Sequence, residues 1–571
     1  MAGRVAYEVQ IYDKGHWAIN ELMPSEESAR QKAKDLLALK HIVGVRIVKE
    51  SHFASDSRRE TEIFKEMKQA EKDDDLSVQP IDSAPVCDRI TDYYKTAARV
   101  TIGRLFSKYV EKFELTPLEL LHSASNLKRI INLDTLVPSA VDKVAALQAR
   151  TTGEDTRKRR EVLFAAIDTL AKRAREAEGK PVAELKGSTL DAVLARIDAK
   201  VADPDERQFL ANMALVKVSL NWQGWIGKIS GLLPLARSEQ DERSLAMVDE
   251  MMADILMART VIKDVIGISK HMGDGIMRVL DLIHGKCVPT KFAAVELVSL
   301  LNTLFAEDKL PRSKAALFDR VARDLKGPVR LTSSEEIGPD KDFFVTLLDR
   351  LVTDHGVIGG SLIANGLAER WARMNNVGGV TGRKKAIEGI CGLVKSGKHK
   401  FVYLLSLYDN KAEAEVRGSI EVHIRALVQQ FDTIRKVAPE ARTEKTRLQE
   451  TAAIQRLVLD SLLEDRFKIP LANAFDALVS EYIISENVIQ RLDDSKLSFR
   501  DRALRLVSFA SSGVLTVGKA TAITRDAVVN YLRRKDFITE FTDGIADPAD
   551  KEKAIKDFYT LLARTGFDMK G

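Results

Sequence analysis

The sequence predicts a mainly α-helical protein that begins with a small α/β domain. Strand-like alternation of apolar and polar residues is confined to the first part of the chain, before about residue 66. Beyond residue 88, apolar residues recur three and four positions apart, which is the spacing of amphipathic helices. The chain has 571 residues, of which 45% are hydrophobic, so it has enough apolar material for more than one packed core.

These differences in sequence pattern divide the chain into four regions. Residues 1–68 are predicted to form a ββαββ module, residues 69–87 a linker, residues 88–335 a helical domain and residues 336–571 a second helical domain. Because no fixed repeat of about 30 to 50 residues is recognisable, the large multi-helix body is expected to be a bundle or an irregular α-solenoid. The boundary near residue 335 lies in KGPVRLTSSEEIGPDKDFF, where Gly, Pro and Ser interrupt the helical periodicity.

The N-terminal module is predicted from four strand signals and one helix signal. Apolar residues alternate with polar ones over residues 5–11, which predicts the first strand. The sequence DKGH then predicts a turn, in which Gly15 can take a positive φ, into a second strand that carries Trp17. Ser25 precedes two glutamates and predicts the start of a helix. Two further strands are expected around Val45 and at RRETEIFK, joined by a polar turn at ASDS.

The linker is predicted from composition. The stretch KQAEKDDDLSVQPIDSAP is first strongly charged and then contains Ser and Pro. It has too little apolar surface to offset the entropy of folding by itself.

Three segments illustrate the helical body. An amphipathic helix is predicted over residues 156–178, TRKRREVLFAAIDTLAKRAREAE. Its basic residues, Arg159 among them, are expected to cover the exposed surface. Its apolar stripe is expected to comprise Val162, Ala165, Ile167, Leu170 and Ala174. A single central helix is predicted over residues 209–233, FLANMALVKVSLNWQGWIGKISGLL, and Gly231 and Pro234 are expected to help terminate it. Residues 243–266 contain a stripe of methionines. We expect these side chains to pack in the core and not to line a groove for a partner protein.

The stretch GLVKSGKHK, residues 392–400, has part of the spacing of a phosphate-binding loop. Gly392, Gly397 and Lys398 stand at the required positions, but His399 replaces the Ser or Thr that would bind magnesium. The residues before it have helical spacing, so no buried strand is predicted to lead into the loop. We interpret the stretch as a glycine-rich joint between helices and keep a nucleotide-dependent enzyme as an alternative.

Charge is nearly balanced, with 88 Lys and Arg residues against 83 Asp and Glu residues. This balance argues against a dedicated polyanion binder. One basic cluster, Arg157, Lys158, Arg159 and Arg160, lies at a predicted helix start, where the helix dipole disfavours cations. A second alternative is a nucleic-acid-binding protein in which this cluster contacts the phosphates.

Cysteine and histidine spacing predicts no metal site and no cofactor. The three cysteines are far apart, which fits a reducing compartment, and His284 with Cys287 supplies only half of a zinc site. Asp354 stands beside His355, but neighbours in sequence point to different sides of a helix and do not form a catalytic dyad by themselves.

The chain is also expected to be cytoplasmic. The N-terminal stretch MAGRVAYEVQIYDKGHW lacks the basic start, apolar core and cleavage site of a secretory signal. Apolar runs are interrupted long before the roughly 20 residues that cross a bilayer, so no membrane span is predicted.

These observations lead to a functional hypothesis. No G-x-S-x-G elbow and no H-E-x-x-H motif occurs in the sequence. Catalytic residues gathered from distant segments would escape such a search. The leading hypothesis is a non-enzymatic, cytoplasmic protein–protein interaction or regulatory scaffold protein, with the helical body as scaffold, the small module as a recognition unit and a protein partner of unknown identity.

Overall fold

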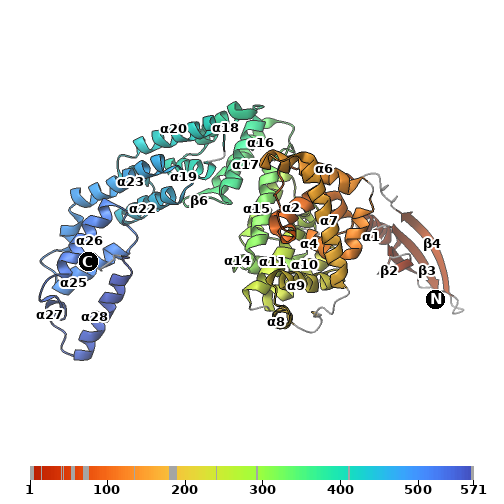
Figure 1. Ribbon diagram of the computed structural model, residues 1–571, viewed down its shortest axis with the longest axis horizontal. Helices are drawn as coiled ribbons and strands as arrows, with labels where there is room; N and C mark the ends of the chain where they lie inside the picture. Colours follow the sequence, from red (N-terminus) through yellow and green to blue (C-terminus); the bar gives the residue numbers. More distant parts are fainter. Residues whose placement is uncertain are drawn as a thin grey trace. The chain divides into compact units, whose positions relative to one another are not determined.

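The computed structural model describes residues 5–13, 16–39, 42, 44–52, 58–67, 76–133, 135–178, 185, 189–238, 241–290, 294–408 and 412–566. A small N-terminal antiparallel sheet is followed by a large helical body, which confirms the predicted fold class (Figure 1). The chain forms two compact units, Met1–Val265 and Ile266–Gly571. The predicted boundary near residue 335 lies inside the second of these units.

The N-terminal module has the predicted ββαββ order. It consists of β1 Val5–Asp13, β2 His16–Met23, α1 Glu26–Ala38, β3 Gly44–His52 and β4 Arg58–Met67. The strands are ordered β2-β1-β3-β4, and each neighbouring pair is antiparallel. The turns predicted at Gly15 and at ASDS lie outside the described residues.

One face of this sheet packs against α1. Val9 pairs with Ile47 in the register of β1 and β3, and both side chains are fully buried with Ala29 and Ala33 of α1. Alternation places these strand residues on a single face, as the period of two requires. The predicted start of α1 is confirmed, because Ser25 forms a capping box with Ser28.

The remainder of the first unit is helical. Its elements are η2 Ile90–Tyr94, α2 Thr96–Leu105, α3 Ser107–Lys112, α4 Pro117–His122, α5 Ala124–Ile131, α6 Leu136–Thr152, α7 Thr156–Glu178, α8 Leu190–Lys200, α9 Pro204–Ser219, α10 Gly224–Ser238, α11 Glu242–Leu256 and, at the end of the unit, α12 Val261–Ile266. The methionine stripe is part of this core, as predicted, because Met247, Met251 and Met252 are buried in α11.

Part of the predicted linker packs against these helices. Residues 76–87 form neither helix nor strand, and the backbone N–H of Gln79 donates to the carbonyl of Leu105 at 2.9 Å. The side-chain amide of Gln148 donates to the carbonyl of Pro85 at 2.5 Å. Leu76 and Val78 pack against the helical core. The apolar residues of this segment therefore attach it to the body, whereas residues 69–75 lie outside the described residues.

Helix α7 occupies the predicted residues but turns a different face inward. The buried side includes Leu163, Ala166 and Leu170, whereas the side chain of Val162 is 46% exposed. The predicted stripe was therefore wrong at Val162 and at Ala165, which is also exposed, whereas Leu170 and Ala174 are buried as predicted. The expectation that Arg159 lies on the surface was also wrong, because it is buried and its Nε donates to Oε1 of Gln148 at 2.8 Å.

The predicted central helix over residues 209–233 is wrong, since the segment forms two helices, α9 and α10. Gly224 has a φ of 67°, a left-handed conformation that interrupts the helix. Trp222 lies directly against Gly231, where an added Cβ would come within 2.3 Å of the indole ring. Pro234 does not end the second helix, because α10 continues past it to Ser238.

The described residues of the second unit form helices and one short hairpin, joined by loops. Its elements are α13 Met272–Ile283, α14 Val295–Ala306, α15 Pro311–Lys326, α16 Ile337–Leu351, β5 Val352–Thr353, β6 Gly356–Val357, α17 Gly360–Met374, α18 Gly379–Leu393, α19 Gly397–Leu407, α20 Ala414–Gln430, α21 Ile434–Val437, α22 Glu444–Asp460, α23 Asp465–Ser485, α24 Val488–Leu492, α25 Phe499–Ser511, α26 Lys519–Leu532, α27 Phe537–Phe541 and α28 Pro548–Ala563.

Helices of the second unit contact mainly helices that lie within three helices of them along the chain. The extensive contacts join α15 with α17, α17 with α18, α22 with α23, and α25 with α26. These helices can be followed from green to blue in Figure 1. Such local packing is typical of α-solenoids, in which each repeat contacts only adjacent repeats.

The loop at the predicted boundary, residues 327–336, is tied to three helices of the second unit. Asp340 of α16 accepts a hydrogen bond from the backbone N–H of Thr332 at 2.8 Å. A guanidinium nitrogen of Arg370 in α17 donates to the carbonyl of Val329 at 2.8 Å. The backbone N–H of Gly273 in α13 donates to the carbonyl of Leu331 at 2.7 Å. The predicted break in helical periodicity is present, and the domain division there stays a prediction.

Candidate polar pocket around Lys398

The stretch GLVKSGKHK forms the junction between α18 and α19. Gly392 lies at the end of α18, and Gly397 is the first residue of α19. The hydroxyl of Ser396 accepts a hydrogen bond from the backbone N–H of His399 at 3.4 Å and so caps α19. Neither glycine has a positive φ. The segment therefore lacks both the preceding strand and the open glycine loop that a phosphate cradle requires.

Lys398 is turned into the protein, where two carboxylates hold it. Its side chain is only 7% exposed, and Nζ lies 2.9 Å from Oδ1 of Asp354 and 3.2 Å from Oε2 of Glu450. Asp354 belongs to the turn between β5 and β6, and Glu450 belongs to α22. One ammonium group therefore joins the hairpin, α19 and α22.

His399 contacts the same carboxylate. Its Nε2 lies 3.1 Å from Oδ1 of Asp354. Partial burial alone would raise the pKa of the Asp354 carboxyl, but the hydrogen bonds and positive charge of Lys398 and His399 hold that pKa below its usual value. Asp354 is therefore ionised at neutral pH.

A pocket of about 390 Å³ lies against this cluster. The end of α21 and the loop that follows it form an apolar wall through Val437, Ala438, Pro439 and Ala441. The remaining lining is polar and consists of Asp354, Ser396, Lys398, His399, Glu440, Arg442, Thr446 and Glu450. Three carboxylates thus face two permanent cations, so the lining is net negative when His399 is neutral.

This arrangement suits the binding of a cation better than the binding of phosphate. A phosphate would have to draw Lys398 away from two carboxylates and would also meet their negative charge. Ser396 is engaged as a helix cap. Burial raises the pKa of the Cys391 thiol in α18 to about 11, so this thiol is not an activated nucleophile.

The basic cluster at the start of α7 is not a single exposed patch. Arg157 and Lys158 are exposed, and their backbone N–H groups are capped by Asp155. Arg159 is buried against Gln148, as described above. Arg160 pairs with Asp142, with Nε 3.0 Å from Oδ1. The sequence cluster therefore presents fewer free cations than four adjacent basic residues indicate.

The other candidate residues considered in the sequence lie apart. His284 is exposed, whereas Cys287 is buried. Asp354 pairs with His399 and Lys398, and no side-chain hydrogen bond or ion pair joins it to His355, both residues being described by the structure. Within the described ranges, no group of three or more His, Cys, Asp or Glu side chains is arranged to hold a metal ion.

Sequence reasoning found Lys398 but missed its partners. Asp354 and Glu450 lie on other elements, and no motif connects them with the glycine-rich stretch. The only local signal was the unusual His399, which proves to share a carboxylate with Lys398.

No known protein family, curated protein or solved structure matches the chain. Along the described ranges, no helix combines the length and the apolar character needed to cross a membrane.

Proposed function

We propose that the protein is a non-enzymatic interaction protein whose polar pocket around Lys398 receives a basic side chain of a protein partner. The observation that carries this proposal is the charge balance of the pocket. Lys398 is already neutralised by Asp354 and Glu450, and Glu440 and Arg442 at the exposed rim carry opposite charges, so the three carboxylates exceed the two permanent cations by one. A guanidinium or ammonium group entering the pocket would therefore gain carboxylate partners.

The shape of the pocket supports the same class of ligand. Arg and Lys side chains combine a long apolar stem with a charged end. The apolar wall from Val437 to Ala441 offers a surface for the stem, and Glu440 lies within that wall. The sequence-local packing of the helices also leaves broad helical surfaces on which the rest of a partner could lie. The protein would accordingly act as a scaffold or regulator and not as a catalyst.

The test combines site-specific crosslinking with binding measurements. A photoreactive amino acid in place of Arg442, at the pocket rim, is introduced into the full chain in its native cells, and the crosslinked peptide is identified by mass spectrometry. A synthetic copy of that peptide is then titrated into the purified full-length protein. We expect the crosslinked peptide to contain Arg or Lys, and its replacement by Ala to weaken binding about tenfold or more.

Matched variants separate the pocket from general surface charge. Glu440→Gln removes the rim carboxylate and is expected to weaken the peptide about tenfold, which corresponds to about 1.4 kcal/mol. Glu481→Gln removes an exposed carboxylate on α23, away from the pocket, and should leave the affinity unchanged. A crosslinked peptide without basic residues, or equal affinities for wild type and Glu440→Gln, contradicts the proposal.

A further inference from the structure

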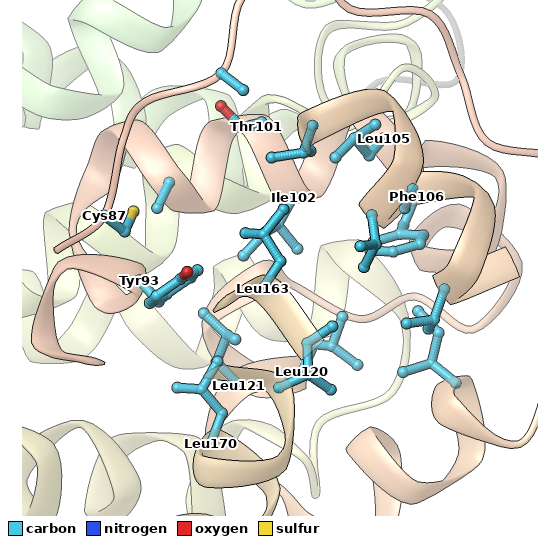
Figure 2. Close-up of a pocket in the computed structure, with 18 of the residues that line it drawn as sticks. Cys87, Tyr93, Thr101, Ile102, Leu105, Phe106, Leu120, Leu121, Leu163 and Leu170 are labelled. Carbon is cyan, nitrogen blue, oxygen red and sulfur yellow. The ribbon is translucent and has the colours of Figure 1, made fainter. Parts of the chain in front are cut away.

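The first unit contains an apolar cavity of about 130 Å³. It is lined by α2, α4, α5, α6 and α7 and, on one side, by Ala84, Pro85 and Cys87 of the segment before η2, and it is partly open to solvent. Figure 2 shows aliphatic side chains from several of these helices converging on it, with Leu163 of α7 near Ile102 of α2 and Leu120 and Leu121 of α4 below.

An unfilled apolar pocket that reaches into a helical core is unusual. Protein cores are normally filled to the density of organic crystals, and an empty space deprives its lining of contacts. Cavities of about 150 Å³ lined by Leu, Ile and Phe stay dry and bind benzene. The lining here is of the same type, with Leu120, Leu163 and Ile102 among its members. The cavity therefore matches the size and chemistry of a single small ring.

One polar group at the wall is left without a partner. The amide of Gln148 is occupied on both sides, by the carbonyl of Pro85 and by Arg159. The hydroxyl of Thr101 donates to a carbonyl within α2. The Tyr93 hydroxyl is buried and has no hydrogen-bond partner among the described residues. Figure 2 shows it among the apolar side chains of the cavity.

The Tyr93 hydroxyl is also a proton donor over the whole physiological pH range. Burial raises the pKa of Tyr93 to about 12, with a smaller contribution from the nearby Cys87. Buried polar groups are normally hydrogen-bonded, and an unpaired one is unfavourable. A ligand oxygen at this point would satisfy the hydroxyl.

We propose that this cavity is a binding site for a compact apolar molecule with one hydrogen-bond acceptor, of the class of aryl ketones and aldehydes, whose oxygen accepts from the Tyr93 hydroxyl. The ring fills the space between α2, α4, α6 and α7. The site lies in the first unit and is independent of the pocket around Lys398. Because Ala84 and Pro85 form part of its wall, ligand contacts also hold residues 76–87 in place.

Two probes of nearly the same shape test the proposal with the full-length protein. Acetophenone carries a carbonyl oxygen, and isopropenylbenzene has a CH₂ group in the same position. Isothermal titration calorimetry is expected to show binding of both, with acetophenone about fivefold tighter because it alone accepts the hydrogen bond. In Tyr93→Phe the two probes should bind with equal affinity.

Two further variants distinguish the cavity from non-specific adsorption. Ala140→Leu places extra atoms in the cavity from α6 and is expected to weaken both probes at least tenfold. Ala146→Leu makes the same change on α6 away from the cavity wall and should leave both affinities unchanged. Hydrogen exchange of residues 76–89 should slow when acetophenone binds to the wild type, which is a readout independent of the filled variant.

Three outcomes would overturn the proposal. The first is no binding of either probe to the wild type at about 1 mM. The second is that both Ala140→Leu and Ala146→Leu bind the probes as tightly as the wild type does. The third is equal affinity of the two probes for the wild type, which would remove Tyr93 as the donor.

Discussion

Lys228 and Glu119 form a buried ion pair in which Nζ lies 2.6 Å from Oε2. The pair joins α10 to α4, whose six residues are all buried. Glu119 also accepts from the backbone N–H of Thr116 and from the hydroxyl of Ser219, each at 2.7 Å. These contacts satisfy a carboxylate that burial would otherwise destabilise.

Replacing Lys228 by Met should destabilise the first unit by about 3 to 5 kcal/mol, because it leaves the Glu119 charge buried without its partner. The double change Glu119→Gln with Lys228→Met should recover part of this loss. The measurement is the urea dependence of hydrogen exchange in peptides from α4 and α10 of the full chain. Lys217→Met, at an exposed position on α9, is the control and should change stability by less than about 0.5 kcal/mol. A small effect of Lys228→Met would contradict the structural role of the pair.

The stability of the first unit should fall as the pH drops below 6.5, because His122 is buried in a neutral form. Burial lowers the pKa of His122 to about 3, and the charges of Arg99 and Arg173 act in the same direction. Above pH 6.5 the imidazole is neutral in both states. Between 6.5 and about 3 the unfolded chain binds the proton and the folded chain does not, so unfolding becomes more favourable.

At pH 5 the loss relative to pH 7 should be about 2 kcal/mol from this residue. This loss of stability is measured by hydrogen exchange of the α4 amides, after correction for the pH dependence of the intrinsic exchange rate. His122→Leu removes the titrating group and should reduce the difference between pH 7 and pH 5 by about the same amount. If the wild type and this variant respond identically to pH, His122 is not the residue responsible.

Two glycines in α18 should respond oppositely to alanine. At Gly389 an added Cβ would lie 2.1 Å from Nε1 of Trp371, so Gly389→Ala should destabilise the second unit by about 1 to 3 kcal/mol. At Gly392 the added Cβ would meet nothing within 4 Å, so Gly392→Ala should be neutral or stabilising by up to about 1 kcal/mol. Thermal unfolding of both variants provides the comparison. Equal destabilisation would show that Gly392 has a role that packing does not explain.

The protein should not bind nucleotide through the glycine-rich stretch. Calorimetry with magnesium ATP at about 1 mM is expected to show no binding to the wild type or to Lys398→Ala, since Lys398 is held by Asp354 and Glu450. Lys395→Ala, at a nearby exposed lysine, is the control. Micromolar ATP affinity that is lost in Lys398→Ala and kept in Lys395→Ala would establish the nucleotide-dependent alternative.

Nucleic-acid binding through α7 should be weak and only mildly dependent on salt. Arg157 and Lys158 are exposed, whereas the exposed Arg160 is paired with Asp142. About two phosphate contacts are therefore expected, for which log Kobs should fall with log salt with a slope of about −2. Filter binding of duplex DNA at several salt concentrations measures this slope. A slope steeper than about −4, abolished by the double change Arg157→Glu with Lys158→Glu, would support the nucleic-acid alternative.

Local sequence patterns were sufficient to predict those elements of secondary structure that depend only on residues close together in the chain. The alternation from Val5 to Ile11 and the capping sequence at Ser25 correctly predicted β1 and the start of α1. Local patterns were insufficient for α7, where the buried side includes Leu163 and not Val162. Apolar residues at adjacent positions support more than one inward face, and the neighbouring helices decide between them.

The sequence by itself determined the helical character of the body, the ββαββ order of the small module and the cap at Ser25, because periodicity and capping act over a few residues. Only the tertiary structure decided that Lys398 meets Asp354 and Glu450, that Arg159 is buried against Gln148, and that an apolar cavity opens beside Tyr93. Contacts between residues far apart in the chain depend on how whole helices pack, and no local pattern specifies that packing.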